Sequence, residues 1–210
     1  MKFYRDMLKL YLVSDRQWLN GRKLTDDLEK AILGGVTIIQ LREKNLNNEE
    51  FINIAYDVKK LCQKYNIPLI INDNLDVALA VDSDGIHIGQ DDIPASIVRK
   101  KIGANKILGV SVHNIEEAIQ ARHDGADYVG VGAIFPTKTK NDATNVTLDK
   151  LQKICDNIDI PVVAIGGITI DNISKLKNIS ISGVAVVSAI MKANDIMAAS
   201  SQLVRKLEHD

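Results

Sequence analysis

The chain has 210 residues, of which 46% are hydrophobic and 25% are charged, a balance typical of a soluble globular protein. Its formal net charge of -1 gives no general attraction to nucleic acid or to an anionic membrane, so we expect neither partner. No apolar run approaches the roughly 18 residues that a membrane span needs. The charged start "MKFYRDMLKL" has no signal-peptide core. Because Cys62 and Cys155 lie far apart in helix-like segments, we expect free thiols and a cytoplasmic location.

Short runs rich in Val, Ile and Leu recur along the chain and predict buried β-strands. Most of these runs are almost continuously apolar, as strands covered on both faces are. The predicted strands lie at residues 8–15, 36–43, 67–73, 85–89, 106–113, 128–134, 160–167 and 183–190.

Segments with helical periodicity lie between the strands. Asn114 is expected to cap one helix, which should stop near Gly125, and residues 194–209 predict a final amphipathic helix. In the segment at 47–66, one apolar face is predicted from Phe51, Ile54, Val58, Leu61 and Tyr65.

Strand and helix alternate about eight times without a linker or a change of composition, which predicts one domain over residues 1–210. Eight βα units in a chain of this length indicate a protein of the α/β class that forms a parallel (β/α)8 (TIM) barrel. A doubly wound open sheet is the alternative. In a barrel the carboxyl ends of all strands converge on one face, so residues at these ends should form a single site.

The second predicted strand runs into the segment "QLREK", where Gln40, Arg42 and Lys44 alternate. Alternate side chains of an extended chain point the same way, so we expect a polar, positively charged row beyond the strand. Such a row suits an anion, although a solvent-exposed strand exit would use the same residue types.

The third and fourth predicted strands each end in acidic residues, which are Asp73, beside Asn72, and the pair Asp91 and Asp92. Neighbouring strands lie about 4.8 Å apart, so carboxylates at adjacent ends would repel each other without a cation between them. Oxygen ligands of this kind favour Mg²⁺. Turn formation and helix capping are the alternative use of these residues.

A polar loop, "FPTKTKNDATN", follows the sixth predicted strand and is long enough to indicate a functional segment. Thr137 and Thr139 offer hydroxyl groups, and Lys138 and Lys140 offer positive charge.

The seventh and eighth predicted strands end in residues that suit a phosphate. Gly166 and Gly167 permit a close approach of the backbone to a ligand, and Ser188 follows the eighth strand. The loops after these two strands are the usual phosphate site of a (β/α)8 barrel. Paired glycines would equally suit a tight turn.

Taken together, these segments resemble the thiamine phosphate synthase family, in order, from about residue 10 to 191. The resemblance is carried by "YLVSD", "QLREK", "IINDN", "GIHIGQDD", "GVSVHN", "YVGVGAIFPTKTK", "VVAIGGIT" and "GVAVVSAI".

The resemblance implies a transferase that joins a hydroxymethylpyrimidine diphosphate to a thiazole phosphate, carboxylated or not, and releases pyrophosphate. The family's chemistry is regarded as dissociative: the bond from carbon to diphosphate breaks first, and the thiazole nitrogen captures the pyrimidine cation. No protein nucleophile is then needed, and catalysis consists of neutralising the leaving group and aligning two rings.

The resemblance also assigns residues to these roles. It implies one Mg²⁺ per subunit on Asp73 and Asp92, whereas Asp91 would serve the turn or cap the next helix. The residues that would neutralise the leaving group are Arg42, Lys44 and Lys140. The pyrimidine diphosphate would lie on Gln40, Arg42, Lys44, Asn72, Ser111 and Lys140. The thiazole phosphate would lie on Thr137, Thr139, Gly167, Val187 and Ser188.

Two other functions remain open from the sequence. A thiazole tautomerase shares this fold but carries a His in the strand that leads to "FPT", where this chain has Ala133. A non-catalytic barrel that binds a phosphorylated ligand is the second alternative. For the enzyme we also expect a homodimer, because barrels of this size commonly self-associate, and hydrogen-bonded structural roles for His87 and His113. The sequence assigns no role to Trp18 and the segment 16–24.

Overall fold

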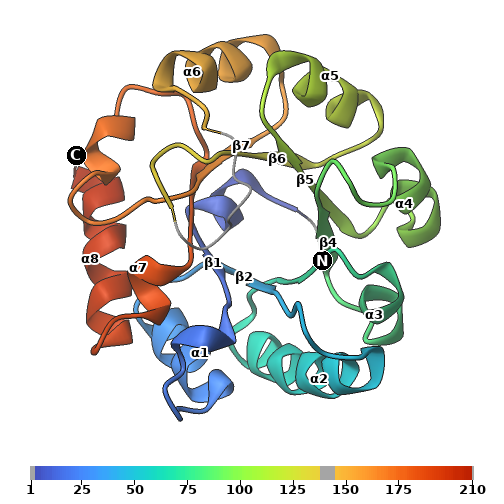
Figure 1. Ribbon diagram of the computed structural model, residues 1–210, viewed down its shortest axis with the longest axis vertical. Coiled ribbons are helices and arrows are strands. Elements are labelled where there is room, and N and C mark those ends of the chain that lie inside the picture. Colours follow the sequence, from blue (N-terminus) through green and yellow to red (C-terminus); the bar gives the residue numbers. More distant parts are fainter. Residues whose placement is uncertain (1–2, 138–144, 210) are drawn as a thin grey trace.

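The computed structural model describes residues 3–137 and 145–209, and within them eight parallel strands close into a barrel (Figure 1). Each strand pairs with its neighbours in chain order, and the last strand pairs with the first. This ring confirms the predicted (β/α)8 barrel over the doubly wound sheet. The strands are β1 (Leu10–Val13), β2 (Ile38–Leu41), β3 (Leu69–Asn72), β4 (Gly85–Ile88), β5 (Ile107–Val112), β6 (Tyr128–Val131), β7 (Val162–Ile165) and β8 (Gly183–Val186).

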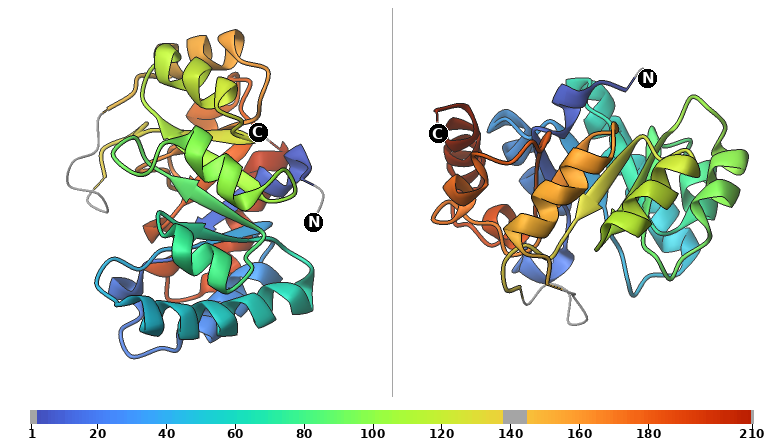
Figure 2. Two further views of the ribbon diagram at one scale, coloured as in Figure 1. Left: turned by 90° about the vertical axis from the view of Figure 1, so that its right-hand side faces the viewer. Right: turned by 90° about the horizontal axis from the view of Figure 1, so that it is seen from above.

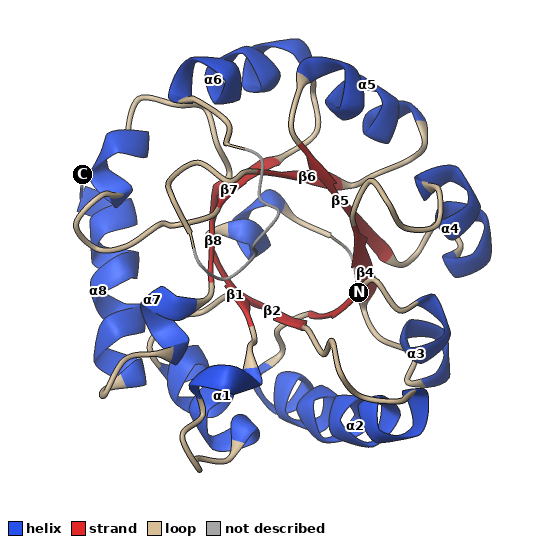
Figure 3. Cartoon of the chain, viewed as in Figure 1, coloured by secondary structure: helices blue, strands red, loops and turns tan. Residues whose placement is uncertain are grey.

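Helices surround this ring of strands, as Figure 3 shows. The α-helices are α1 (Leu24–Leu33), α2 (Asn48–Tyr65), α3 (Leu75–Ala80), α4 (Ala95–Ile102), α5 (Ile115–His123), α6 (Leu148–Asn157), α7 (Ser188–Met191) and α8 (Ile196–His209). Among the described residues, short 3-10 helices accompany them: η1 (Arg5–Leu8), η2 (Arg16–Trp18) and η3 (Ile173–Leu176).

The crossover from β7 to β8 differs from the regular alternation that the sequence predicts, because η3 takes the place of an α-helix. Asn172 accepts a hydrogen bond from the backbone N–H of Thr169 and donates one to the carbonyl of Gly167. These bonds fold the start of the crossover into a turn directly before η3.

The strands are apolar on both faces because each face is covered. Inward side chains fill the barrel, and outward ones pack against the helices seen from two further sides in Figure 2. The interior cluster comprises Leu8, Tyr11, Val13, Ile38, Ile70, Ile107, Tyr128, Val163 and Ala185.

Helix α2 shows how local sequence positions an outer element. Asn47 accepts a hydrogen bond from the N–H of Glu50, whose side chain accepts from the N–H of Asn47, forming a capping box. The buried face of this helix shares Phe51 and Val58 with the predicted one and adds Ala55 and Cys62. It comprises Phe51, Ala55, Val58 and Cys62, with Ile54, Leu61 and Tyr65 partly buried beside it.

The N-terminal segment closes the end of the barrel opposite to the carboxyl ends of the strands. Leu8 of η1 is fully buried in the interior cluster, and the ring of Phe3 stacks on Tyr128 with centroids 6.1 Å apart. The barrel therefore opens toward the carboxyl ends of its strands.

Both cysteines are free, as expected, with Cys62 buried under α2 and Cys155 partly exposed on α6. Across residues 3–137 and 145–209, no helix has the length and apolar character of a membrane span.

Replacing Asn47 by Ala should lower the free energy of unfolding by about 1 kcal/mol, because the first turn of α2 would lose its capping box. Urea unfolding followed by circular dichroism measures this loss. Lys23 is a matched control: it occupies the cap position of α1, but its side chain makes no capping bond. Equal losses for Lys23→Ala and Asn47→Ala would contradict the capping role.

Candidate active site

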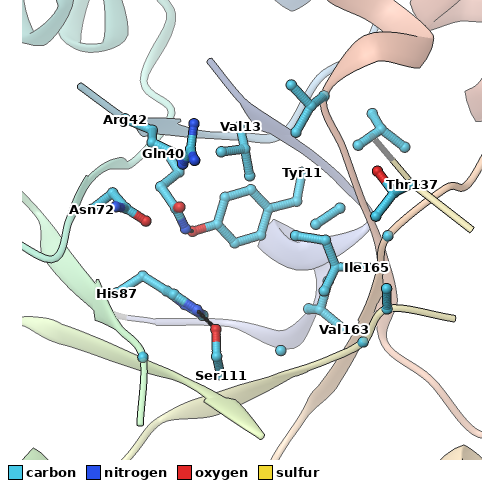
Figure 4. Close-up of a pocket in the computed structure, with 18 of the residues that line it drawn as sticks. Tyr11, Val13, Gln40, Arg42, Asn72, His87, Ser111, Thr137, Val163 and Ile165 are labelled. Atoms are coloured by element: carbon cyan, nitrogen blue, oxygen red, sulfur yellow. Dashed lines mark hydrogen bonds between the residues drawn. The ribbon is translucent and has the colours of Figure 1, made fainter. Parts of the chain in front are cut away.

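A cavity of about 300 Å³ opens at the carboxyl ends of the strands, and every one of the eight strands contributes to its lining. Figure 4 shows part of this lining, with Tyr11, Gln40 and His87 directed into the cavity. The predicted site residues that line the cavity are Gln40, Arg42, Lys44, Asn72, Asp73, Asp92, Ser111, Thr137, Gly167, Val187 and Ser188. Thr139 and Lys140 lie outside the described residues.

The "QLREK" segment delivers a polar row to the cavity wall. The amide of Gln40 is buried in β2 and donates to the Tyr11 hydroxyl across 2.8 Å. The N–H of Arg42 donates to the Ser14 hydroxyl, which fixes the chain just beyond the strand. Lys44 makes no ion pair within the described part of the chain. All three alternating side chains reach the cavity, as the extended geometry requires.

Between Arg42 and Lys44, the carboxyl group of Glu43 turns away from the cavity. It lies 3.7 Å from the guanidinium of Arg16, and its side chain is only 7% exposed. Burial is the main cause that raises its pKa, with Arg16 acting against it. Meanwhile Asp15 lies 3.5 Å from the Arg42 guanidinium. The segment after β1 thus contacts the "QLREK" segment on both faces, an arrangement that the sequence did not predict.

Asp73 and Asp92 face each other at the neighbouring ends of β3 and β4. Asp73 adopts a left-handed backbone with φ 61°, and its N–H donates to the His87 carbonyl at 2.8 Å. Burial first, and then the charge and hydrogen bonding of Asp92, raise the pKa of Asp73 to about 6. The Asn72 amide and Arg42 oppose this rise. The two carboxyl groups therefore form a close pair of like charges.

Asp91 lies in the turn after β4, one of the two roles expected for it, but the other role, as a helix cap, is wrong. The side-chain hydrogen bond in this turn comes from Asp92, whose Oδ2 accepts from the N–H of Gly89 at 2.7 Å. Pro94 occupies the cap position of α4, where no side chain makes a capping bond. Asp91 is exposed at the rim of the cavity.

The loops after β6 and β7 pack on each other at the opposite arc of the cavity. The N–H of Phe135 donates to the Gly166 carbonyl at 3.0 Å. Gly167 has φ 63°, and a Cβ there would lie 2.5 Å from the Pro136 carbonyl oxygen. Only glycine permits this contact, which brings Thr137 and Gly167 to the same wall. Ser188 joins them from the first position of α7.

Three further polar residues line the floor of the cavity, and the apolar strand pattern did not reveal their part in it. The hydroxyls of Tyr11 and Tyr128 lie 2.8 Å apart, and His87 contacts the Tyr128 hydroxyl through Nδ1. His87 Nε2 lies 2.9 Å from the Ser111 hydroxyl. The expected hydrogen-bonded role of His87 is confirmed. His113 likewise bonds Glu117 at the start of α5.

The segment 16–24, for which the sequence gave no role, is fastened to α7. Arg22 donates through Nη2 to the carbonyls of Trp18 and Met191, at 3.0 and 2.9 Å. Its Nε donates to the fully buried Asp27. Lys192 lies over the Trp18 ring. The first and last βα loops of the barrel are thereby joined beside Ser188.

Cations and adjacent carboxylates on one arc of the cavity, with glycine turns and hydroxyls on the other, define a barrel enzyme that acts on small phosphorylated molecules.

Comparison with known proteins narrows this class. The family model described as thiamine monophosphate synthase matches residues 10–190. The thiamine-phosphate synthases of Clostridium tetani and Alkaliphilus oremlandii are 56% and 58% identical, each over 92% of this chain and 93% of the relative. The solved thiamine phosphate pyrophosphorylase of Pyrococcus furiosus superposes with a TM-score of 0.90 at 39% identity, over 97% of both chains.

The chain belongs to the thiamine monophosphate synthase family, and it is a transferase. The comparisons support the synthase interpretation of the sequence, and not the tautomerase-like or the non-catalytic alternative.

Replacing Arg22 by Ala should lower the free energy of unfolding by about 3 kcal/mol, because Asp27 would remain as a buried, unpaired charge. Urea unfolding measures the loss. The double variant Arg22→Met with Asp27→Leu should recover most of it, and the exposed Arg205→Ala should stay within about 0.5 kcal/mol of the wild type. A double variant as unstable as Arg22→Ala would show that packing, rather than charge, explains the loss.

Proposed function

We propose that the chain joins a hydroxymethylpyrimidine diphosphate to a thiazole phosphate in the barrel mouth, with one Mg²⁺ between Asp73 and Asp92. The observation that carries this proposal is the close pair of carboxyl groups at the ends of β3 and β4. The neighbouring charge of Asp92 contributes to the raised pKa of Asp73, and a divalent cation in the same place would remove this repulsion.

The donor set suits Mg²⁺. In the part of the chain that the structure describes, no group of three or more His, Cys, Asp and Glu side chains could hold a metal ion. Because no third side chain of these types joins them among the described residues, Asp73 and Asp92 would supply two oxygen ligands. Most of the octahedral shell would be left to water and phosphate oxygens, as Mg²⁺ prefers. When bound there, Mg²⁺ would withdraw charge from the diphosphate as it leaves.

The arc from β2 to β5 would hold the pyrimidine diphosphate. Arg42 and Lys44 carry positive charge beside the carboxyl pair, and this location suits a diphosphate that shares the cation. Lys140 is proposed to act on the same leaving group. The neutral donors and acceptors for the rest of this substrate would be Gln40, Asn72 and Ser111.

The arc from β6 to β8 would hold the thiazole phosphate. Gly167 exposes its backbone on the wall that Thr137 also lines, and Ser188 adds a hydroxyl at the start of α7. Val187 completes this wall, and Thr139 is proposed to join it. The two arcs face each other across one cavity, so both substrates would meet above the barrel axis.

The arrangement suits a reaction without a protein nucleophile. Ser111 and His87 are within hydrogen-bond distance, but His87 Nδ1 faces the Tyr128 hydroxyl rather than a carboxylate. In a serine triad a carboxylate takes the place that the Tyr128 hydroxyl takes here. The residues would instead stabilise charge as the bond to diphosphate breaks and hold the thiazole nitrogen in line with the pyrimidine carbon.

A cytoplasmic location belongs to the same proposal and is supported by the two free thiols. The homodimer and the lack of nucleic-acid binding stay predictions.

Replacing Asp73 or Asp92 by Asn should reduce turnover about 100-fold or more and raise the Mg²⁺ concentration needed, because the cation would lose a charged ligand. Detection of thiamine phosphate from both substrates measures turnover. A second measurement needs no turnover: Mg²⁺ with pyrophosphate should raise the melting temperature of the wild type but not of these variants.

Asp91→Asn is the matched control, because it removes a neighbouring carboxylate that makes no turn bond. It should retain most turnover and the full thermal shift. A wild-type shift that persists in both Asp73→Asn and Asp92→Asn would exclude the proposed metal site.

Replacing Lys140 by Ala should lower kcat by about 100-fold and change the KM for thiazole phosphate little, because the charge that Lys140 meets grows as the bond breaks. Steady-state kinetics with each substrate varied separates the two effects. Lys138→Ala removes a charge from the same loop and should cost much less. A variant that lost only thiazole affinity, with unchanged kcat, would show that Lys140 belongs to the other half of the site.

A further inference from the structure

A continuous chain of hydrogen bonds crosses the barrel interior beneath the cavity. It runs from Gln40 Nε2 to the Tyr11 hydroxyl (2.8 Å), to the Tyr128 hydroxyl (2.8 Å), to His87 Nδ1 (3.0 Å), and from His87 Nε2 to the Ser111 hydroxyl (2.9 Å). Figure 4 shows its two ends, Gln40 meeting Tyr11 and His87 meeting Ser111. We call these five residues the relay. Its first four members are at most 8% exposed.

The barrel is built around the relay. A Cβ at Gly109 in β5 would lie 2.3 Å from the Tyr128 hydroxyl oxygen and 2.5 Å from His87 Nδ1. A Cβ at Gly130 in β6 would lie 3.2 Å from His87 Cε1. A side chain at Gly109 would therefore displace Tyr128 and His87, and one at Gly130 would press on the His87 ring.

The direction of hydrogen-bond donation along the relay follows from its end at Gln40. Its amide nitrogen can only donate, so the Tyr11 oxygen accepts there. Burial raises the pKa of both phenols, so each keeps one proton at neutral pH. If Tyr128 donated to Tyr11, the Tyr11 proton would lack an acceptor among the described residues, at a cost of about 1–3 kcal/mol. Tyr11 therefore donates to Tyr128.

The remaining protons are then fixed in turn. Tyr128 donates to His87 Nδ1, so the neutral imidazole carries its proton on Nε2. His87 Nε2 donates to the Ser111 oxygen, and the hydroxyl hydrogen of Ser111 is left to point into the cavity. The floor of the cavity thus presents a hydrogen-bond donor at Ser111.

We propose that Tyr128, supported by Tyr11, is a positioning residue for substrate recognition: it holds His87 so that Ser111 donates its hydroxyl hydrogen to a ring nitrogen of the pyrimidine. The inference rests on the proposed assignment of Ser111 to the pyrimidine side. A ring nitrogen is an acceptor only, so it matches the outward hydrogen of Ser111. A reversed relay would present an acceptor there and would disfavour the same ring.

Nitrogen-15 NMR of the His87 ring tests the direction without any substrate. The wild type should show Nε2 protonated and Nδ1 as a hydrogen-bonded acceptor. Tyr128→Phe should lose the hydrogen-bond signature at Nδ1. A proton on Nδ1 in the wild type would mean that the relay runs from Ser111 toward Gln40, and would overturn the inference while leaving the proposed function in place.

Kinetics test the positioning role. Tyr128→Phe should raise the KM for the pyrimidine diphosphate about tenfold, the effect of losing one well-oriented buried hydrogen bond, and keep the KM for thiazole phosphate within about twofold. When Ser111 is already replaced by Ala, adding Tyr128→Phe should raise this KM by less than about a further twofold, because the two substitutions remove the same interaction. Tyr56→Phe, which removes a surface hydroxyl bonded to the Ala80 carbonyl, is the matched control and should change neither KM.

If Tyr128→Phe does not fold, Tyr11→Phe removes the donor one step earlier and should shift the same KM in the same direction. Additive effects of Tyr128→Phe and Ser111→Ala would overturn the positioning role. An unchanged KM in Ser111→Ala alone would overturn the assignment of Ser111 in the proposed function, and the positioning role with it.

Discussion

Closure of the parallel barrel is the constraint on which the rest of the molecule depends. The pairing of β8 with β1 turns eight short strands into a ring, so all their carboxyl ends lie on one rim. The carboxyl pair and the cations follow β2, β3 and β4, whereas Thr137 follows β6, the glycine turn follows β7 and Ser188 follows β8. An open sheet with the same strands would spread these residues along a line. The two half-sites face each other only because the ring is closed.

Electrostatics then sorts the charges around this rim. Asp15 lies close enough to Arg42 to compete with an incoming diphosphate, whereas Glu43 is turned away and paired with Arg16. At Asp73 and Asp92 the balance is different: burial and the neighbouring Asp92 raise the pKa of Asp73, although the Asn72 amide and Arg42 oppose the rise. The repulsion between the carboxylates of Asp73 and Asp92 lies at one point of the rim, and a cation bound at that point would relieve it.

The sequence predicted the barrel because parallel strands buried on both faces leave a simple apolar pattern. It also brought together the residues at the strand ends, since barrel topology alone places them. It did not reveal the relay, because Tyr11 and Tyr128 look like ordinary core residues within apolar runs. The glycines at 109 and 130, which weaken a strand without an evident reason, were the available signal. The sequence also did not predict that Asp92, and not Asp91, accepts the hydrogen bond from Gly89 in the turn. This depends on the local backbone geometry, which residue spacing does not reveal.

The hydrogen bond from Arg22 to the carbonyl of Met191 joins residues that are 169 positions apart in the chain. It lies near the pairing of β1 with β8, which closes the barrel. During synthesis, β1 leaves the ribosome with one unpaired edge and must wait for the last strand before that edge is covered. Arg22, which is paired with Asp27, likewise cannot donate to the carbonyl of Met191 until α7 has been synthesised. The growing chain therefore carries an exposed strand edge for almost its whole length, and a truncated product lacking the final βα unit would present that edge to other chains.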